Sequence, residues 1–222
     1  MSVPTVYTQI RDWFKSDLDE LKESTLERLT LLVVGILRAE SAAPARVAKA
    51  LHELGLSDAH APSIERRIRR IENDPDISAA RCVHPLARER LLLGKPRELL
   101  LVLDPTTQDD RVVMVSVAVW YRGRALPLAW VLWAGNTPLT GARFWERIAA
   151  LLDVVKPLLP QGIPITWLAD RAFGSPAFLD LLTARGWHYV VRLQGQTRCQ
   201  DRQGRTQRVC DLVAQRGQRA KL

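Results

Sequence analysis

The stretch LLLVLD at residues 99–104 decides the fold that this sequence predicts. Five consecutive apolar residues suit a strand that is buried on both faces, and Asp104 is expected to end it. Two more runs, 112–120 and 125–133, are rich in β-branched and aromatic residues and are separated by short polar turns. Because short turns join antiparallel neighbours, residues 99–133 are predicted to form a three-stranded meander.

Helices and strands alternate after the meander. Apolar residues repeat at helical spacing over 144–155, whereas residues 163–169 form a strand-like run that leads directly to Asp170. A second helix over 176–185 and a fifth strand over 187–192 complete the pattern. The order β-β-β-α-β-α-β predicts an α/β architecture in which helices pack on a mixed sheet.

Aromatic residues and cysteines suggest no chemistry in this pattern. Several Trp residues lie on predicted strand or helix faces and are therefore expected in the core, namely Trp120, Trp130, Trp133, Trp145 and Trp167. Cys82, Cys199 and Cys210 are too scattered for a disulfide framework and lack the spacing of a zinc site.

Residues 1–98 are predicted to be helical. The sequence STLE at residues 24–27 has the form of a capping box, which predicts a helix with the serine as its N-cap. A second helix is expected to begin at Pro44 and to end at Gly55, because Pro is favoured at a first helical position and Gly after a last one. A third helix is expected to begin after Ser63.

The third predicted helix has basic side chains opposite an apolar stripe of Ile64, Ile68 and Ile71. These basic side chains are Arg66, Arg67, Arg69 and Arg70. A short helix, a Gly-containing turn and an Arg-rich helix are typical of a helix-turn-helix, so residues 44–72 predict a DNA-binding segment. A plain helical bundle with a solvated basic face fits the same pattern equally well.

The net charge of +8 is concentrated toward the C-terminal end of the chain. Residues 171–222 hold ten of the 32 basic side chains but only three of the 24 acidic ones. Such an excess favours a polyanionic partner, because Lys and Arg that neutralise phosphates release counterions. A solvated tail is the alternative that composition leaves open.

Composition also excludes several classes of protein. The chain has 47% hydrophobic and 25% charged residues, which are ordinary values for a globular protein. No apolar run approaches the ~20 residues of a membrane helix, and no secretory signal opens the chain. We therefore expect a cytoplasmic protein of one or two domains without a membrane partner.

Two aspartates, Asp104 and Asp170, directly follow predicted strands. A carboxylate at the end of a buried strand is costly unless something compensates its charge. If the two strands are parallel neighbours, the side chains converge and can share a divalent cation, and hard oxygen ligands select Mg²⁺ or Mn²⁺. Two such ions would clamp the attacking and leaving oxygens of a phosphodiester. The alternative is that each Asp is an ordinary turn or helix N-cap residue.

Three stretches around these residues resemble a known family. LVLDPTT at residues 101–107 resembles the first catalytic motif of insertion-sequence transposases of the DDE class. LADRAFGS at residues 168–175 resembles their second motif, in the branch with a β-rich insertion before the final acid, and YVVRL at residues 189–193 resembles the strand that follows. The resemblance implies an RNase H-like core over residues 99–193, whose strand order agrees with the order predicted above.

The resemblance also implies roles for particular residues. Asp104 and Asp170 would be catalytic and would hold Mg²⁺ or Mn²⁺, while the helical segment 1–98 would bind the double-stranded end of the transposon. The DNA-contacting side chains would be Arg66, Arg67, Arg69, Arg70, Arg171, Arg192, Arg198, Arg202 and Arg205.

The third acid of the family is the point at which this sequence departs. In the family it is a Glu on a later helix, yet no Glu occurs here after Glu146. The resemblance implies that residues 194–222 begin the basic insertion and that the RNase H-like domain is truncated. We therefore expect a DDE transposase, which cleaves and transfers DNA strands, in a form that is inactive alone. The alternative is a non-catalytic DNA-binding fragment that inhibits full-length copies, and the sequence leaves open whether homodimers form.

Overall fold

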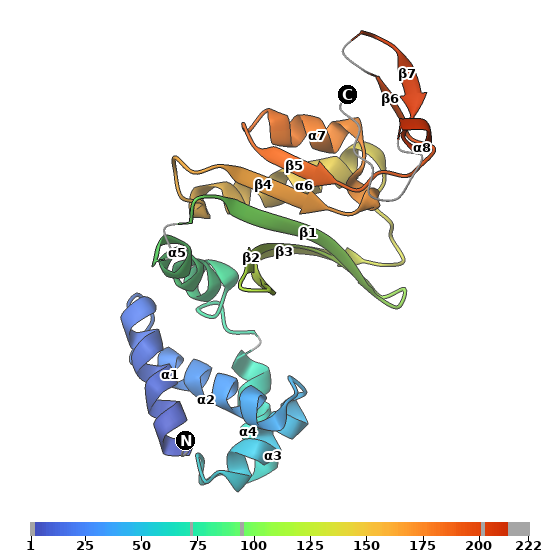
Figure 1. Cartoon of the computed structure of the whole chain (residues 1–222). Helices are drawn as coiled ribbons and strands as arrows, with labels where there is room; N and C mark the ends of the chain where they lie inside the picture. The colour runs from blue at the N-terminus through green and yellow to red at the C-terminus, as the bar shows by residue number, and fades with distance from the viewer. Residues whose placement is uncertain (1–2, 72, 94–95, 201–202, 213–222) are drawn as a thin grey trace. The chain divides into compact units, whose positions relative to one another are not determined.

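The computed structural model describes residues 3–71, 73–93, 96–200 and 203–212. The chain divides into two compact units, Met1–Gly94 and Lys95–Leu222. The first is helical and the second contains the sheet (Figure 1). No helix in these described ranges combines the length and the apolar character needed to cross a bilayer.

The helical unit follows the predicted boundaries at α3 but not at α2, nor at α4, which begins at Ala61 rather than after Ser63. Its helices are α1 (Val3–Asp17), α2 (Glu23–Ala39), α3 (Pro44–Glu53), α4 (Ala61–Ile71), the π-helix η1 (Ala79–Val83) and α5 (His84–Leu93). Pro44 opens α3 as predicted, and the chain turns after it at Gly55, whose φ of +63° favours glycine. The prediction of Ser24 as the N-cap of a capping box is wrong, because Lys22 is the N-cap of α2. The Lys22 carbonyl already accepts hydrogen bonds from the amide N–H groups of Thr25 and Leu26.

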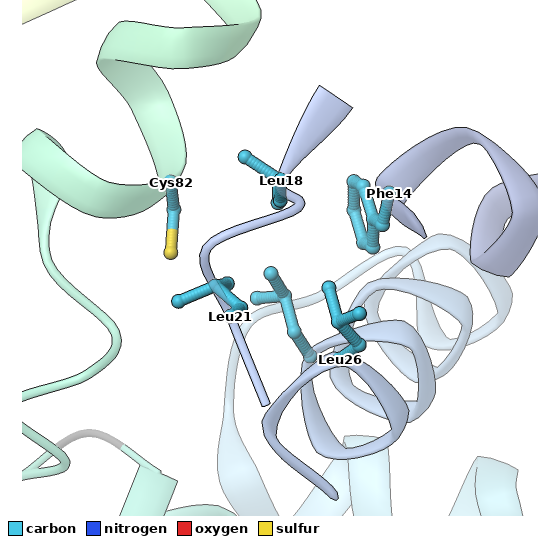
Figure 2. Close-up of a cluster of buried hydrophobic side chains, with 6 residues drawn as sticks. Phe14, Leu18, Leu21, Leu26 and Cys82 are labelled. Carbon is cyan, nitrogen blue, oxygen red and sulfur yellow. The ribbon is translucent and has the colours of Figure 1, made fainter. Parts of the chain in front are cut away.

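Two small apolar cores hold the helical unit together. In one, Phe14, Leu18, Leu21 and Leu26 converge with Cys82 of η1 (Figure 2). In the other, α2, α3 and α4 bury Val47, Ala48, Leu51, Ile64 and Ile68. The predicted apolar stripe of the third helix is confirmed, since Ile64, Ile68 and Ile71 are all buried.

The second unit is built on a five-stranded mixed sheet. Its main elements are β1 (Leu99–Gln108), β2 (Val112–Tyr121), β3 (Arg124–Ala134), α6 (Gly141–Val155), β4 (Ile165–Ala169), α7 (Pro176–Thr183) and β5 (His188–Val191). The strand order is β3-β2-β1-β4-β5; β1 pairs antiparallel with β2 and parallel with β4. This is the strand order of an RNase H-like fold, and the predicted α/β class is confirmed.

Strand β1 is longer than the sequence predicts. We expected it to end at Asp104, but it continues to Gln108. The strand continues because its antiparallel pairing with β2 extends from Asp104↔Ser116 to Gln108↔Val112. Its parallel pairing with β4 ends at Leu103, so beyond this residue only one side of β1 is paired. Pro105 is tolerated here because a proline, which has no N–H, fits a strand with one open side.

One face of the sheet is covered by helices. Leu101, Leu103 and Trp167 are fully buried there, and α6 and α7 lie against this face (Figure 1). The Trp133 ring contacts Phe144 of α6 edge-on, with ring centroids 6.0 Å apart. Burial of such large apolar side chains is the main term that stabilises this unit.

The opposite face of the sheet leaves apolar side chains exposed. Trp120 and Trp130 were predicted to be core residues, yet they are 49% and 40% exposed. The prediction is wrong for these two because they lie on the strand face that α6 and α7 do not cover. Trp167, in contrast, is fully buried as predicted.

Several short elements flank the strands of the sheet and complete the unit. The 3-10 turn η2 (Lys156–Leu158) precedes β4, and η3 (Arg171–Phe173) follows it. After β5 come a small antiparallel hairpin, β6 (Arg198–Gln200) and β7 (Thr206–Arg208), and the helical turn α8 (Val209–Leu212). The amide N–H groups of Val209 and Cys210 donate to the carbonyls of Thr197 and Gly195, which closes α8 onto the start of the hairpin.

Candidate metal and nucleic-acid site

Asp104 and Asp170 directly follow the last residue pair of the parallel pairing between β1 and β4. Leu103 and Ala169 are the last pair in the parallel register, and Asp104 and Asp170 are the next residues on their strands. Neighbouring strands lie about 4.8 Å apart. Because side chains alternate across a strand, both aspartates share the face of the pair Val102↔Leu168. The condition set by the sequence argument, that the two strands are parallel neighbours, is therefore met.

Both aspartates are exposed and line one open groove of about 500 Å³. The floor of the groove is apolar, with Val102, Leu168 and Val190 side by side, and Arg192 lies at its edge. Within the described part of the chain, neither aspartate side chain has a hydrogen-bond or ion-pair partner. The two carboxylates are therefore available to an external cation.

The ordinary alternatives, a turn residue or a helix N-cap, fit these two residues only in part, since Asp170 is the N-cap residue of η3. Asp104 lies inside β1 rather than in a turn, and the Ser116 hydroxyl donates to its backbone carbonyl at 3.5 Å. Asp170 precedes η3, but its side chain makes no capping bond. Asp109 and Asp110 lie in the β1–β2 turn, as predicted.

The LADRAFGS motif anchors Asp170 by packing. Phe173 is fully buried, with its ring centroid 6.2 Å from that of Phe144 and 5.4 Å from that of Phe178. Its amide N–H donates to the Asp170 carbonyl at 2.9 Å. At Gly174, an added Cβ would lie 2.9 Å from the Leu193 side chain, so a glycine lets the turn approach the segment after β5 closely.

The basic residues predicted to contact DNA fall into three groups. Arg171 and Arg192 are exposed beside the carboxylates, and Arg192 lines the groove. Arg198 and Arg205 are exposed in the β6–β7 hairpin, and Arg202 lies outside the described residues.

The remaining four arginines are all exposed on α4 of the helical unit. Arg69 forms an ion pair with Glu65 at 2.8 Å, which occupies part of its charge. For Arg66, Arg67 and Arg70, no hydrogen-bond or ion-pair partner is found among the described residues.

Sequence reasoning missed two residues on the site face. Trp120 lines the same groove as the carboxylates, and Trp130 follows Asp104 and Ser116 across the sheet in register. A Trp on a strand is a core residue by default. Only the pairing register, which the sequence does not contain, reveals that both lie on the uncovered face.

Residues 147–221 match the family model of the transposase DDE domain. The match contains Asp170 and the LADRAFGS motif but not Asp104. The resemblance to DDE transposases is thereby confirmed for this part of the chain. No curated protein sequence matches this one significantly.

Solved transposase structures show a slight likeness to the chain. The catalytic domain of the Mos1 mariner transposase is 12% identical, with a TM-score of 0.32, over 48% of this chain and 55% of that one. The same domain with raltegravir and manganese is 13% identical, also with a TM-score of 0.32, over 48% of this chain and 55% of that one. The Mos1 strand transfer complex is 11% identical, with a TM-score of 0.28, over 73% of this chain and 57% of that one. The chain thus spans about half the length of these structures.

Proposed function

We propose that this chain is a DDE transposase component that binds transposon-end DNA and holds divalent cations at Asp104 and Asp170. The observation that supports this most is the pair of unpartnered carboxylates at adjacent positions of neighbouring parallel strands. The family match covers the second of them. The reaction of the complete enzyme would be cleavage of the transposon end followed by strand transfer.

The residues present fit a magnesium or manganese ion. Mg²⁺ commonly takes only one or two protein carboxylates and completes its shell with water and substrate phosphate. Asp104 and Asp170 would hold the ion, and the chemistry it would supply when bound is polarisation of the phosphodiester and a lower pKa for an attacking water or hydroxyl. Arg192, at the groove edge, would orient the phosphate by charge-assisted hydrogen bonds.

The helical unit would supply most of the DNA affinity. Helices α3 and α4 are separated by residues 54–60, and α4 presents its arginines to solvent. Exposed arginines contact phosphates and make binding strongly salt-dependent. The basic residues of the β6–β7 hairpin would add contacts of the same kind.

A non-catalytic role is the second candidate, and one observation favours it. Within the described ranges, no cluster of three or more acidic, His or Cys side chains surrounds a common point. With only two acidic side chains at this site among the described residues, the chain would bind end DNA without cutting it. In mixed complexes it would then inhibit copies that carry all three acids.

The test is a binding and nicking assay on DNA from the ends of the element that encodes the chain. We expect a mobility shift without Mg²⁺ that weakens steeply with salt, and no nicking. Nicking should appear in a version that carries the family's Glu-bearing segment. In that version, Asp104→Asn and Asp170→Asn should abolish nicking, while Asp180→Asn on α7 should not. Undiminished nicking by either of the first two variants would refute the proposed site.

A further inference from the structure

The groove of the candidate site ends at a tryptophan that the proposed function does not use. Trp120 lines this groove together with Asp104 and Asp170. Val119 pairs with Leu101, which places Trp120 four residues before Asp104 in the register of β1 and β2. At about 3.3 Å per residue, the backbone of Trp120 lies about 13 Å from that of Asp104 along the strands. The groove therefore has a carboxylate end and an aromatic end.

The Trp120 side chain is available to a ligand. The residue is 49% exposed on the sheet face that α6 and α7 leave uncovered, beside the apolar groove floor at Val102 and Val190. A Trp side chain combines a large apolar area with a flat π face, so a second ring that stacks on it is bound favourably. Trp120 therefore presents a stacking surface at its end of the groove.

The turn that follows Trp120 is basic. Arg122 and Arg124 are exposed, and neither has an ion-pair partner within the ranges that the structure describes. Cζ of Arg122 lies 5.3 Å from the ring centroid of Tyr121, a cation-π contact that holds this guanidinium beside the end of β2. The aromatic end of the groove is thus next to two unpaired positive charges, which attract a polyanion.

A ring beside unpaired cations favours an unpaired stretch of nucleic acid as the ligand. In proteins that bind single strands, bases stack on aromatic side chains while basic side chains contact the backbone. In a duplex both faces of a base are already stacked on its neighbours, so only an unpaired base can lie on the Trp120 ring. The groove volume of about 500 Å³ is within the range of about 300–1,000 Å³ that accommodates a small-molecule ligand, so a nucleotide has room there.

We propose that Trp120 stacks on an unpaired base of the DNA strand held at the carboxylates, and that Arg122 and Arg124 contact the phosphates beside that base. This inference rests on the proposed function, since it takes the ligand of the groove to be DNA. The separation of about 13 Å corresponds to roughly four nucleotides at 3.4 Å per step. The site thus selects DNA whose strands are separated within a few nucleotides of the reacting phosphodiester.

The experiment measures binding of the full chain to two fluorescein-labelled probes, an oligothymidine strand and a duplex of mixed sequence. EDTA is present, so that no cation at the carboxylates contributes. Their own charge has little effect at the ring, because 13 Å exceeds the Debye length of about 8 Å at 0.15 M salt. Fluorescence anisotropy gives the affinity for each probe.

Trp120→Leu should bind the single strand about fivefold or more weakly, as expected for the loss of one stacked base. Trp120→Phe keeps an aromatic ring and should retain most of the affinity. Both variants should bind the duplex as the unaltered chain does. Arg122→Gln/Arg124→Gln should weaken single-strand binding and make it less dependent on salt, and an unchanged salt dependence would refute the role of these two arginines.

Trp130→Leu is the matched control, because Trp130 is exposed on the same face but does not line the groove. It should bind both probes as the unaltered chain does. The proposal is overturned if Trp120→Leu binds the single strand normally, the result expected if a protein helix covers this face instead. Equal losses in Trp120→Leu and Trp120→Phe, in Trp120→Leu and Trp130→Leu, or on both probes would also overturn it.

The two proposals fail in different ways in this experiment. Normal duplex binding together with a silent Trp120→Leu would refute the stacking site and leave the proposed function standing. A chain that binds the single strand through Trp120 but does not bind the transposon-end duplex would refute the proposed function and leave the stacking site standing.

Discussion

Replacing Phe173 by Ala should weaken the sheet unit and release the turn that positions Asp170. The Phe173 side chain is fully buried and touches two further rings, Phe144 and Phe178. Truncation of a buried Phe costs about 3–5 kcal/mol, because transfer energy is lost and a cavity remains. For a unit of this size, each 1 kcal/mol lowers the melting temperature by about 4 °C. The expected decrease is therefore roughly 12–20 °C.

Calorimetry measures this decrease, and Val154→Ala is the matched control. Val154 is an apolar residue of the same unit, on α6, but it is 47% exposed. Its truncation should change the free energy of unfolding by no more than about 0.5 kcal/mol. Equal effects of the two substitutions would refute the claim that the motif anchors Asp170 through ring packing.

Three further predictions concern single positions. Gly35→Ala should lower the free energy of unfolding of the helical unit by about 1–3 kcal/mol in urea, because the added Cβ would lie 2.6 Å from Val47 Cγ1. This loss is expected even though Ala favours helices. Adding Val47→Ala should recover part of the loss, and additive losses of the two substitutions would contradict the clash. Gly174→Ala should lower the melting temperature, because its Cβ would meet a backbone carbonyl at 3.2 Å; an unchanged melting temperature would show that the turn can move. Burial raises the pKa of the Cys82 thiol, so a disulfide reagent should label exposed Cys210 rapidly and Cys82 only in denaturant; equal rates would contradict the burial of Cys82.

The spacing of apolar residues was sufficient to predict the order, along the chain, of the strands and helices in the second unit. Runs of apolar residues identified the strands, and helical spacing identified α6, whose end at Val155 lies before Pro157 as predicted. The alternation of three hairpin-linked strands with two helices then left few topologies, because crossover connections have a fixed hand. The neighbouring positions of β1 and β4 remained a condition of the sequence argument, and the pairing register of the structure supplies them.

Boundaries and faces could not be predicted in the same way. The capping-box prediction failed because the backbone carbonyl of Lys22, two residues before Ser24, already accepts the first helical hydrogen bonds. Nothing in the sequence STLE excludes this earlier start of the helix. The extension of β1 depends on pairing with β2, a long-range contact. Trp120 and Trp130 were placed in the core because hydrophobicity alone does not say which face of a strand the helices cover.

The most direct test of the metal site is cleavage of the protein backbone by bound iron. Fe²⁺ takes the place of Mg²⁺ and reduces added hydrogen peroxide to hydroxide and a hydroxyl radical, which cuts the chain near the ion, while ascorbate reduces the resulting Fe³⁺ back to Fe²⁺. We predict cuts beside both Asp104 and Asp170, and the loss of both cuts in Asp104→Asn as well as in Asp170→Asn. Asp180→Asn should leave both cuts in place. Cuts at one aspartate only, or variants that each lose only their own cut, would contradict a shared site.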